Sequence, residues 1–133
     1  MASFHLQIVT PDRPVYDGEA ERVIVRTAGG DVCILARHID YAAPLGIGEA
    51  RVTDAEGKTR LAACSGGLIN VSNGEVRVIA TTFEWADEID QARAAQAQRA
   101  AEEKLRALQK DDVDYAVAEA KLKRALIRQR VKG

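Results

Sequence analysis

The chain has 133 residues and a mass of 14.4 kDa, the size of one ordinary domain. Its 19 basic and 20 acidic side chains give a formal net charge of −1, which argues against binding driven by the phosphate charge of nucleic acid. Hydrophobic residues make up 47% and charged residues 29%, so we expect a folded chain with a core rather than disorder. We expect neither a membrane span nor a secretory signal, because the sequence has no apolar run long enough for either.

Residue types are divided unevenly along the chain. Nine of the ten glycines lie at or before Gly74, and all three prolines lie at or before Pro44. From Ala86 to Lys132 there are twelve alanines and no Gly or Pro. Because alanine favours helices and the earlier composition favours strands and turns, we predict a β-rich part over residues 1–85 and a helical part over residues 86–133.

The β-rich part alternates short strand-like runs with turn signals roughly every 8 to 12 residues, which is typical of a sandwich or barrel. The first strand is Phe4–Ile8, where apolar side chains occupy every second position. The next turn signals lie at Pro11–Pro14, at Asp17-Gly18 before a strand over 19–27, and at 28–31 before a strand over 32–35.

Residues 36–48 show no clean period, so we predict a surface loop there. Glu56-Gly57 and Asn73-Gly74 each separate two alternating runs and predict hairpins. Ser65-Gly66-Gly67 predicts a bulge or a close backbone approach. The expected fold of this part is a β-sandwich of about eight to ten short antiparallel strands.

Helical spacing governs the rest of the chain. One apolar stripe comprises Ala94, Ala97, Ala101, Leu105 and Leu108, and a second comprises Tyr115, Ala118, Leu122 and Leu126. Between them lies Gln109-Lys110-Asp111-Asp112, where an aspartate can cap the second helix. We therefore expect a C-terminal antiparallel α-helix hairpin, and its alanine-rich interface buries little area, which predicts a hairpin capable of opening.

No pattern for catalysis or metal binding is present. Cys33 and Cys64 form no CxxC pair and lie in apolar runs, so we expect two core thiols rather than a disulfide. His5 and His38 are isolated, and we assign no metal site. There is no Walker sequence and no Ser-His-Asp order, so we assign no catalytic residue.

Several motifs, taken in their order and spacing, resemble a known family: Leu6-Gln7-Ile8-Val9-Thr10-Pro11, Val15-Tyr16-Asp17-Gly18, Gly30 to Leu35 followed by His38, Ser65-Gly66-Gly67, Glu88 to Ala94 and Ala101 to Leu105. Across nearly its whole length the chain is similar to the ε subunits of bacterial F-type ATP synthase, whose mitochondrial counterpart is δ. It departs from the family around His38, where it lacks both of the prolines that members often carry.

The resemblance implies an N-terminal β-sandwich followed by a C-terminal helix hairpin. It also implies a non-catalytic central-stalk subunit of a proton-translocating enzyme, at the cytoplasmic face of the bacterial membrane and attached to that membrane only through the complex. The implied partners are the γ subunit, the c-subunit ring and the catalytic β and α subunits, with no nucleic acid. The ring-facing positions would be Gly30, Asp31 and His38, although His38 alone fits a solvent-exposed loop residue equally well.

In the family the helices regulate ATP hydrolysis by changing between a folded and an extended form. From Glu119 onward six basic residues face one acidic residue, and an extended basic helix suits an acidic segment of the catalytic β subunit. A solvated helix face is the alternative. The residues expected to contact the catalytic head are Lys121, Lys123, Arg124 and Arg128.

The resemblance also implies ATP as a candidate regulatory ligand, with no cofactor required. Family members that bind ATP carry an Ile/Leu-Asp-x-x-Arg-Ala motif, which is present here as Ile89, Asp90, Arg93 and Ala94. The implied site adds Glu84, Arg124 and Arg128, and a further basic position, displaced by one residue, at Arg99. An Asp90–Arg93 salt bridge is the alternative reading of the motif.

A competing class is a free-standing β-sandwich adaptor whose basic hairpin binds an acidic protein or RNA. RNA binding of this kind uses basic and aromatic residues together on one surface. Aromatic residues make up only 5% of the chain, which weighs against this class.

Overall fold

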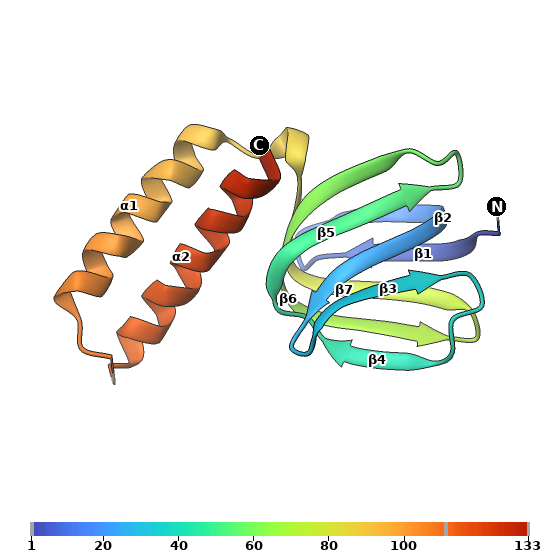
Figure 1. The fold of residues 1–133 in the computed structure, drawn as a ribbon, viewed down its shortest axis with the longest axis horizontal. Helices are drawn as coiled ribbons and strands as arrows, with labels where there is room; N and C mark the ends of the chain where they lie inside the picture. The colour runs from blue at the N-terminus through green and yellow to red at the C-terminus, as the bar shows by residue number, and fades with distance from the viewer. Residues whose placement is uncertain (1, 111, 133) are drawn as a thin grey trace.

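The computed structural model describes residues 2–110 and 112–132. Figure 1 shows a β-sandwich with a pair of helices at one end, so the expected fold class is confirmed. In the described residues there are seven strands: β1 (Phe4–Val9), β2 (Pro14–Thr27), β3 (Gly30–Leu35), β4 (Tyr41–Pro44), β5 (Ile47–Asp54), β6 (Thr59–Ser72) and β7 (Glu75–Trp85).

Seven strands replace the expected eight to ten because two of them are long. β2 and β6 each span 14 residues and pair with different neighbours along their length. The sheet order is β1-β7-β6-β5-β2-β3, β4 pairs with β6, and β1 also pairs with β2. The β1–β7 pairing is parallel, so the expectation of wholly antiparallel strands is wrong at this edge. These pairings fold one sheet onto itself around a single core.

The sandwich core comes from alternate residues of its strands. Phe4, Leu6 and Ile8 are all buried, as the first alternating run predicts. The largest fully buried side chains include the following aliphatic residues: Leu6, Ile8, Val23, Val25, Ile34, Val52, Ile69, Val71 and Val78. Period-2 alternation therefore determined which face of each strand is buried.

The prediction of a turn at Asp17-Gly18 is wrong. Both residues lie inside β2, where they pair with Gln7 and Leu6 of β1. The chain reverses earlier, where the backbone N–H of Thr10 donates to the Arg13 carbonyl oxygen at 3.0 Å. Here the neighbouring strand β1 supplies partners for the backbone polar groups, and strand pairing replaces the turn that Asp-Gly would otherwise favour.

The prediction of a loop over residues 36–48 is also wrong in part. β4 (Tyr41–Pro44) pairs with residues 68–71 of β6, and β5 begins at Ile47. This pairing joins segments far apart in sequence, so no local period reports it. Its proline lies at the end of a short edge strand, where a missing N–H is tolerated.

Both predicted hairpins are confirmed, with Gly57, Asn73 and Gly74 at positive φ. Of the two alternatives predicted for Ser65-Gly66-Gly67, the close backbone approach is confirmed and the bulge is not, because Ser65↔Thr82 and Gly67↔Ala80 keep one β6–β7 register. A Cβ at Gly67 would lie 1.9 Å from the Ile79 carbonyl oxygen, so this position requires glycine.

Three helical elements follow the sandwich: the 3₁₀ turn η1 (Ala86–Glu88), α1 (Gln91–Ala107) and α2 (Val113–Lys132). Asp112 caps α2 by accepting from the Asp114 N–H at 2.9 Å, as expected of an aspartate there; Asp111 lies outside the described residues. The first predicted stripe is confirmed, with Ala94 and Ala101 buried.

The second stripe is wrong at Leu126, which is 44% exposed, whereas the neighbouring Ala125 is fully buried. The closely packed alanine seam between the helices accommodates the smaller side chain. No helix in the described residues is long and apolar enough to cross a membrane.

The expectation of two core thiols is half right. Cys64 is buried, and burial raises the pKa of its thiol to about 12. Cys33 is exposed, because β3 turns Ile34 toward the core and Cys33 toward the outer face.

Candidate functional site

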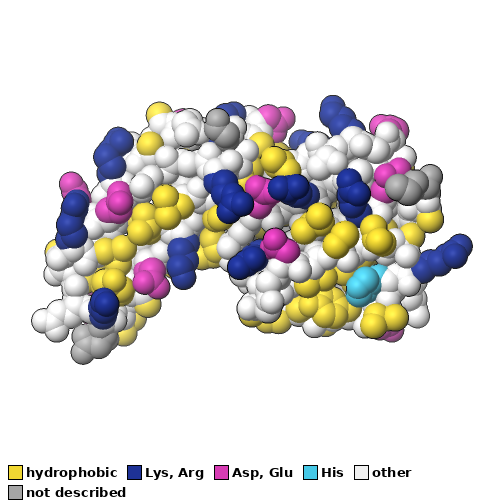
Figure 2. Space-filling model, viewed as in Figure 1, with side chains coloured by type: hydrophobic (Ala, Val, Ile, Leu, Met, Phe, Trp, Pro, Cys, Tyr) yellow, Lys and Arg dark blue, Asp and Glu magenta, His cyan; other side chains and the backbone are white. Residues whose placement is uncertain are grey.

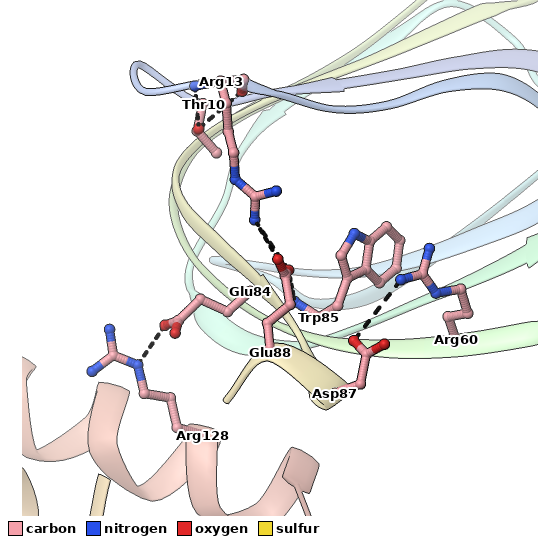
Figure 3. Close-up of polar contacts among 8 residues, drawn as sticks. All are labelled: Thr10, Arg13, Arg60, Glu84, Trp85, Asp87, Glu88 and Arg128. Atoms are coloured by element: carbon pink, nitrogen blue, oxygen red, sulfur yellow. Dashed lines mark hydrogen bonds and ion pairs between the residues drawn. The ribbon is translucent and has the colours of Figure 1, made fainter. Parts of the chain in front are cut away.

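The two parts of the molecule meet where β7 gives way to the helices, and Figure 3 shows the polar contacts there. Trp85 ends β7 inside the sandwich core, with its ring edge-on to Phe83 at 5.1 Å and to Tyr16 at 6.5 Å between centroids. Aromatic pairs of this geometry favour a fixed ring position. The sandwich therefore ends at a rigid residue.

Two arginines of the sandwich contact η1, the turn after Trp85. One guanidinium nitrogen of Arg13 lies 3.0 Å from each carboxylate oxygen of Glu88, which also accepts from the Trp85 N–H at 3.1 Å. Arg60 stacks over the Trp85 ring at 3.8 Å and reaches the Asp87 carboxylate at 3.9 Å (Figure 3).

The C-terminal end of α2 also touches the sandwich. Arg128 Nε lies 2.5 Å from Glu84 Oε1, and each side chain is about one-third exposed. Beside this ion pair a small apolar cluster joins Ala63 of β6 to Ile89 and Val131. On the face shown in Figure 2, basic and acidic side chains alternate around this junction.

A hollow of about 170 Å³ opens at this junction, lined by Glu84, Glu88, Ile89, Asp90, Arg93, Ala94, Ala97 and Arg128. Six of the eight residues expected to contact ATP are in this set. The hollow is smaller than the roughly 300–1,000 Å³ typical of small-molecule pockets. In this conformation it can therefore hold only part of a nucleotide, and Arg128 is already paired with Glu84.

A second hollow of about 490 Å³ lies between α1 and α2, lined by Ala97, Ala100, Ala101, Lys104, Ala118, Lys121, Arg124 and Arg128. It has four cations and no carboxylate in its lining. Ala97 and Arg128 line both hollows, so the two adjoin each other along the hairpin. Such a groove suits a polyanion, because several cations can contact separate phosphate oxygens.

The structure separates two predicted site residues from this groove. Arg99 is exposed on α1 and lines neither hollow. Lys123, expected with the head-contacting cations, instead lies 3.9 Å from Glu119 on its own helix. The other three cations of that group, Lys121, Arg124 and Arg128, meet in the second hollow.

The Asp90–Arg93 salt bridge offered as an alternative is wrong. Among the described residues Asp90 accepts from the backbone N–H of Arg93 at 3.2 Å, which makes it the N-cap of α1. Capping the helix leaves the Arg93 guanidinium on the rim of the first hollow.

The three expected ring-facing residues do not cluster. Gly30 and Asp31 begin β3, whereas His38 follows its other end. The His38 ring packs edge-on against Tyr41 at 5.8 Å, and its Nδ1 lies 2.7 Å from the Ile39 carbonyl oxygen. A strand extends about 3.3 Å per residue, so a ring contact that included Gly30, Asp31 and His38 would have to extend along the whole of β3.

Sequence reasoning missed several residues of these surfaces. Glu88, Ala97 and Lys104 line the hollows, while Leu35 and Ile39 are 54% and 78% exposed beside His38. Glu88 follows Trp85 by three residues, the spacing of a capping box, but the tryptophan in place of Ser or Thr hides the pattern. In the described residues no cluster of three metal-ligating side chains occurs.

Family models match both parts of the chain in order. Residues 3–86 match the model described as ATP synthase, Delta/Epsilon chain, beta-sandwich domain. Residues 87–133 match ATP synthase, Delta/Epsilon chain, long alpha-helix domain.

Curated relatives match over the full length. The ATP synthase epsilon chain of Bacillus velezensis is 44% identical over 133 residues, covering 100% of this chain and 99% of that one. The epsilon chain of Bacillus licheniformis is 44% identical over 128 residues and covers 96% of each.

Solved structures share the fold. A chain of the Euglena gracilis mitochondrial ATP synthase, in an OSCP/F1/c-ring structure, aligns with a TM-score of 0.79 and 25% identity over 92% of this chain and 77% of that one. A chain of the Tetrahymena thermophila mitochondrial ATP synthase central stalk and c-ring shows the fold alone, with a TM-score of 0.61 and 12% identity over 97% and 96%. Since both family models and the full-length relatives agree, the chain belongs to the ATP synthase delta/epsilon chain family.

Proposed function

We propose that the chain works in the central stalk of an F-type ATP synthase, without catalytic residues of its own. The sandwich contacts the γ subunit and the c-subunit ring, and it helps pass rotation between proton flow and the catalytic α and β subunits. The full-length match to epsilon chains carries this proposal, because it includes both domains in order. The complex then holds the chain at the cytoplasmic face of the membrane.

Co-purification tests the proposed assembly. A tagged copy expressed in its own cells should bring down the γ, α and β subunits together with the ring. A lone monomer would contradict the proposal, and a monomer carrying RNA would instead support the adaptor class.

For the ring contact we propose the end of β3 that carries His38. The exposed Leu35 and Ile39 give this end an apolar surface that Gly30 and Asp31 lack. Exposed apolar patches of this kind mark protein contacts. Cysteines placed at positions 39 and 31 should differ in cross-linking to the ring, with position 39 the more efficient; the reverse order would assign the contact to the other end.

We propose that the hairpin regulates ATP hydrolysis by leaving the sandwich. Among the described residues its attachment consists of one partly exposed ion pair, worth about 0–1 kcal/mol, a cluster of a few apolar side chains, and packing of α2 along β5 and β6. Release would free Arg128 and carry Lys121 and Arg124 toward an acidic surface of the catalytic head. An equilibrium of a few kcal/mol is within reach of a partner or a ligand.

Removing residues 91–133 tests this regulation in the assembled enzyme. We expect assembly to be kept and ATP hydrolysis to rise. Within the full chain, Lys121→Glu with Arg124→Glu should also raise hydrolysis, while Lys123→Glu, outside the basic hollow, is the matched control. Unchanged hydrolysis in both the truncated and the doubly substituted enzyme would count against a regulatory hairpin.

We propose that ATP binds across the two hollows and holds the hairpin folded. The base and ribose would lie near Ile89 and Ala94, and the phosphates would lie against Arg124 and Lys121. The Arg128–Glu84 pair must rearrange before Arg128 can contact a phosphate, because the Glu84 carboxylate already holds its guanidinium. A ligand touching both helices stabilises the folded form, by a free energy that rises with the logarithm of its concentration once it exceeds the Kd.

Calorimetric titration of the chain with ATP tests the site. We expect binding that weakens at least tenfold in Arg124→Ala, while Lys123→Ala leaves it unchanged. Arg99→Ala distinguishes the family-based assignment from the observed geometry. Because Arg99 lines neither hollow, the geometry predicts unchanged ATP binding, whereas the family-based assignment predicts weaker binding. No heat at millimolar ATP would remove the proposal.

A further inference from the structure

The linker between sandwich and hairpin is held at both of its ends. Trp85 and Ile89 flank η1, and each is only 4% exposed. Trp85 belongs to the main core, while Ile89 packs on Ala63 of β6 and on Val131 of α2. The 3₁₀ turn is closed by the Ile89 N–H, which donates to the Ala86 carbonyl oxygen at 3.3 Å. It is therefore a structured turn and not a slack tether.

Charged contacts add a second layer to this anchorage. Arg13 comes from the turn between β1 and β2, 75 residues before Glu88. It neutralises the carboxylate that caps Trp85, so the cap and the ion pair share one acceptor group. Arg60 covers the Trp85 ring from β6 (Figure 3). Both arginines belong to the sandwich, and the ion pairs that they form among the described residues are with Glu88 and Asp87 of η1.

Immediately after η1 the backbone leaves the helical conformation. Ile89 and Asp90 are both extended, with φ and ψ of −79° and 129° and of −87° and 109°. α1 then begins as a separate capped unit, with the Arg93 N–H on the Asp90 carboxylate and the Ala94 N–H on the Asp90 carbonyl. Two extended residues thus lie between two closed helical turns, which is where a hinge absorbs φ/ψ change at least cost.

We propose that Arg13 and Arg60 are positioning residues that keep η1 on the sandwich, so that the hairpin turns about Ile89–Asp90 and not about Trp85. This inference rests on the proposed movement of the hairpin. It identifies the residues that fix the pivot, and it identifies η1 as the segment that remains on the sandwich when the hairpin moves. Glu84 and Glu88, on the sandwich side of the hollow, then remain in place while Arg93 and Arg128 move away with the helices.

Native-state hydrogen exchange of the full chain at low urea concentrations tests the pivot. Segments that open together exchange as one unit. In the wild type we expect α1 and α2 to open first, while the Ile89 amide exchanges with the sandwich. In the Arg13→Ala/Arg60→Ala double variant the Ile89 amide should exchange with the helices, at least tenfold faster than in the wild type. Arg13→Lys in place of Arg13→Ala should recover much of the protection.

Lys58→Ala is the matched control, because it removes a nearby exposed cation whose hydrogen bonds to Asp54 run through its backbone and are kept by alanine. It should leave Ile89 with the sandwich. If Ile89 exchanges with the helices in the wild type, or stays with the sandwich in the double variant, the positioning role of Arg13 and Arg60 is overturned. The proposed movement of the hairpin would still stand. If the helices open only together with the sandwich, the proposed movement fails and the pivot fails with it.

Discussion

The sandwich and the hairpin bury different kinds of side chain. The sandwich core contains buried Leu, Ile, Val and aromatic residues from every strand except β4, several of them fully buried. The hairpin seam buries mainly alanines, namely Ala94, Ala101, Ala118 and Ala125. Since apolar burial stabilises by roughly 25 cal/mol per Å², the two parts differ widely in how firmly they are held.

That difference allows one chain to combine a rigid part with a movable part. A sandwich that transmits force must keep its shape, whereas a hairpin that responds to a ligand must open at a cost of a few kcal/mol. The junction contains residues of both the rigid and the movable part. Trp85 belongs to the rigid part, and Val131 belongs to the movable part.

Gly67→Ala should produce the largest effect in the sandwich. The new Cβ would meet backbone atoms of β7, so we expect a loss of roughly 4 kcal/mol or more in the free energy of unfolding. Gly74→Ala is the matched control, because Gly74 also has positive φ but has no atom within 4 Å of an added Cβ. It should cost only about 1–2 kcal/mol. Equal losses in urea denaturation would show that φ alone matters.

Thiol labelling should separate the two cysteines by orders of magnitude. Cys33 is exposed and should react in the native state. Cys64, whose pKa is raised to about 12, should react only when the sandwich opens. A hairpin-releasing change such as Arg128→Glu should leave Cys64 labelling unchanged. Faster Cys64 labelling in that variant would mean that the two parts open together.

Val71→Ala and Val131→Ala remove the same two methyl groups from equally buried sites, 2% and 3% exposed. Each should cost about 1–2 kcal/mol, but in different parts of the molecule. Val71→Ala should lower the global urea midpoint. Val131→Ala should speed hydrogen exchange in α1 and α2 and hardly move that midpoint. A matching fall of the midpoint in both variants would argue for one cooperative unit.

A small pH effect should be confined to the sandwich. The hydrogen bond that His5 donates to the Asp17 carboxylate raises the pKa of His5 above its usual 6.5. A raised folded-state pKa gives stability that is fully present below the unfolded pKa and is lost as pH rises through the folded one. The wild type should therefore lose a little stability relative to His5→Gln above about pH 6.5, measured as urea midpoints. Parallel pH profiles for the two proteins would exclude this pair as a contributor.

Much of the fold could be predicted from local patterns. The alternation in Phe4–Ile8, the Asn73-Gly74 hairpin and the close backbone approach at Ser65-Gly66-Gly67 are all confirmed. These features depend on side-chain period and backbone φ, which act over a few residues. For the candidate site, the Ile89–Ala94 motif and the arginines of α2 identified most of the residues that the fold brings to the first hollow.

The pairings that failed depend on distant partners. Asp17-Gly18 became part of a strand because β1 lies beside it, and Tyr41–Pro44 became a strand because β6 does. The exclusion of Arg99 from the hollows likewise followed from how the helices pack. None of these outcomes has a local signature.

By itself the sequence determined a β-rich part followed by two alanine-rich helices, and the motifs of one family, because composition and spacing act locally. Only the tertiary structure decided that Arg13 would reach Glu88 and that Arg128 would pair with Glu84. Contacts between residues tens of positions apart depend on how the strands and helices are arranged in space. The proposed pivot of the hairpin depends on the first of these contacts, and the attachment of α2 to the sandwich depends on the second.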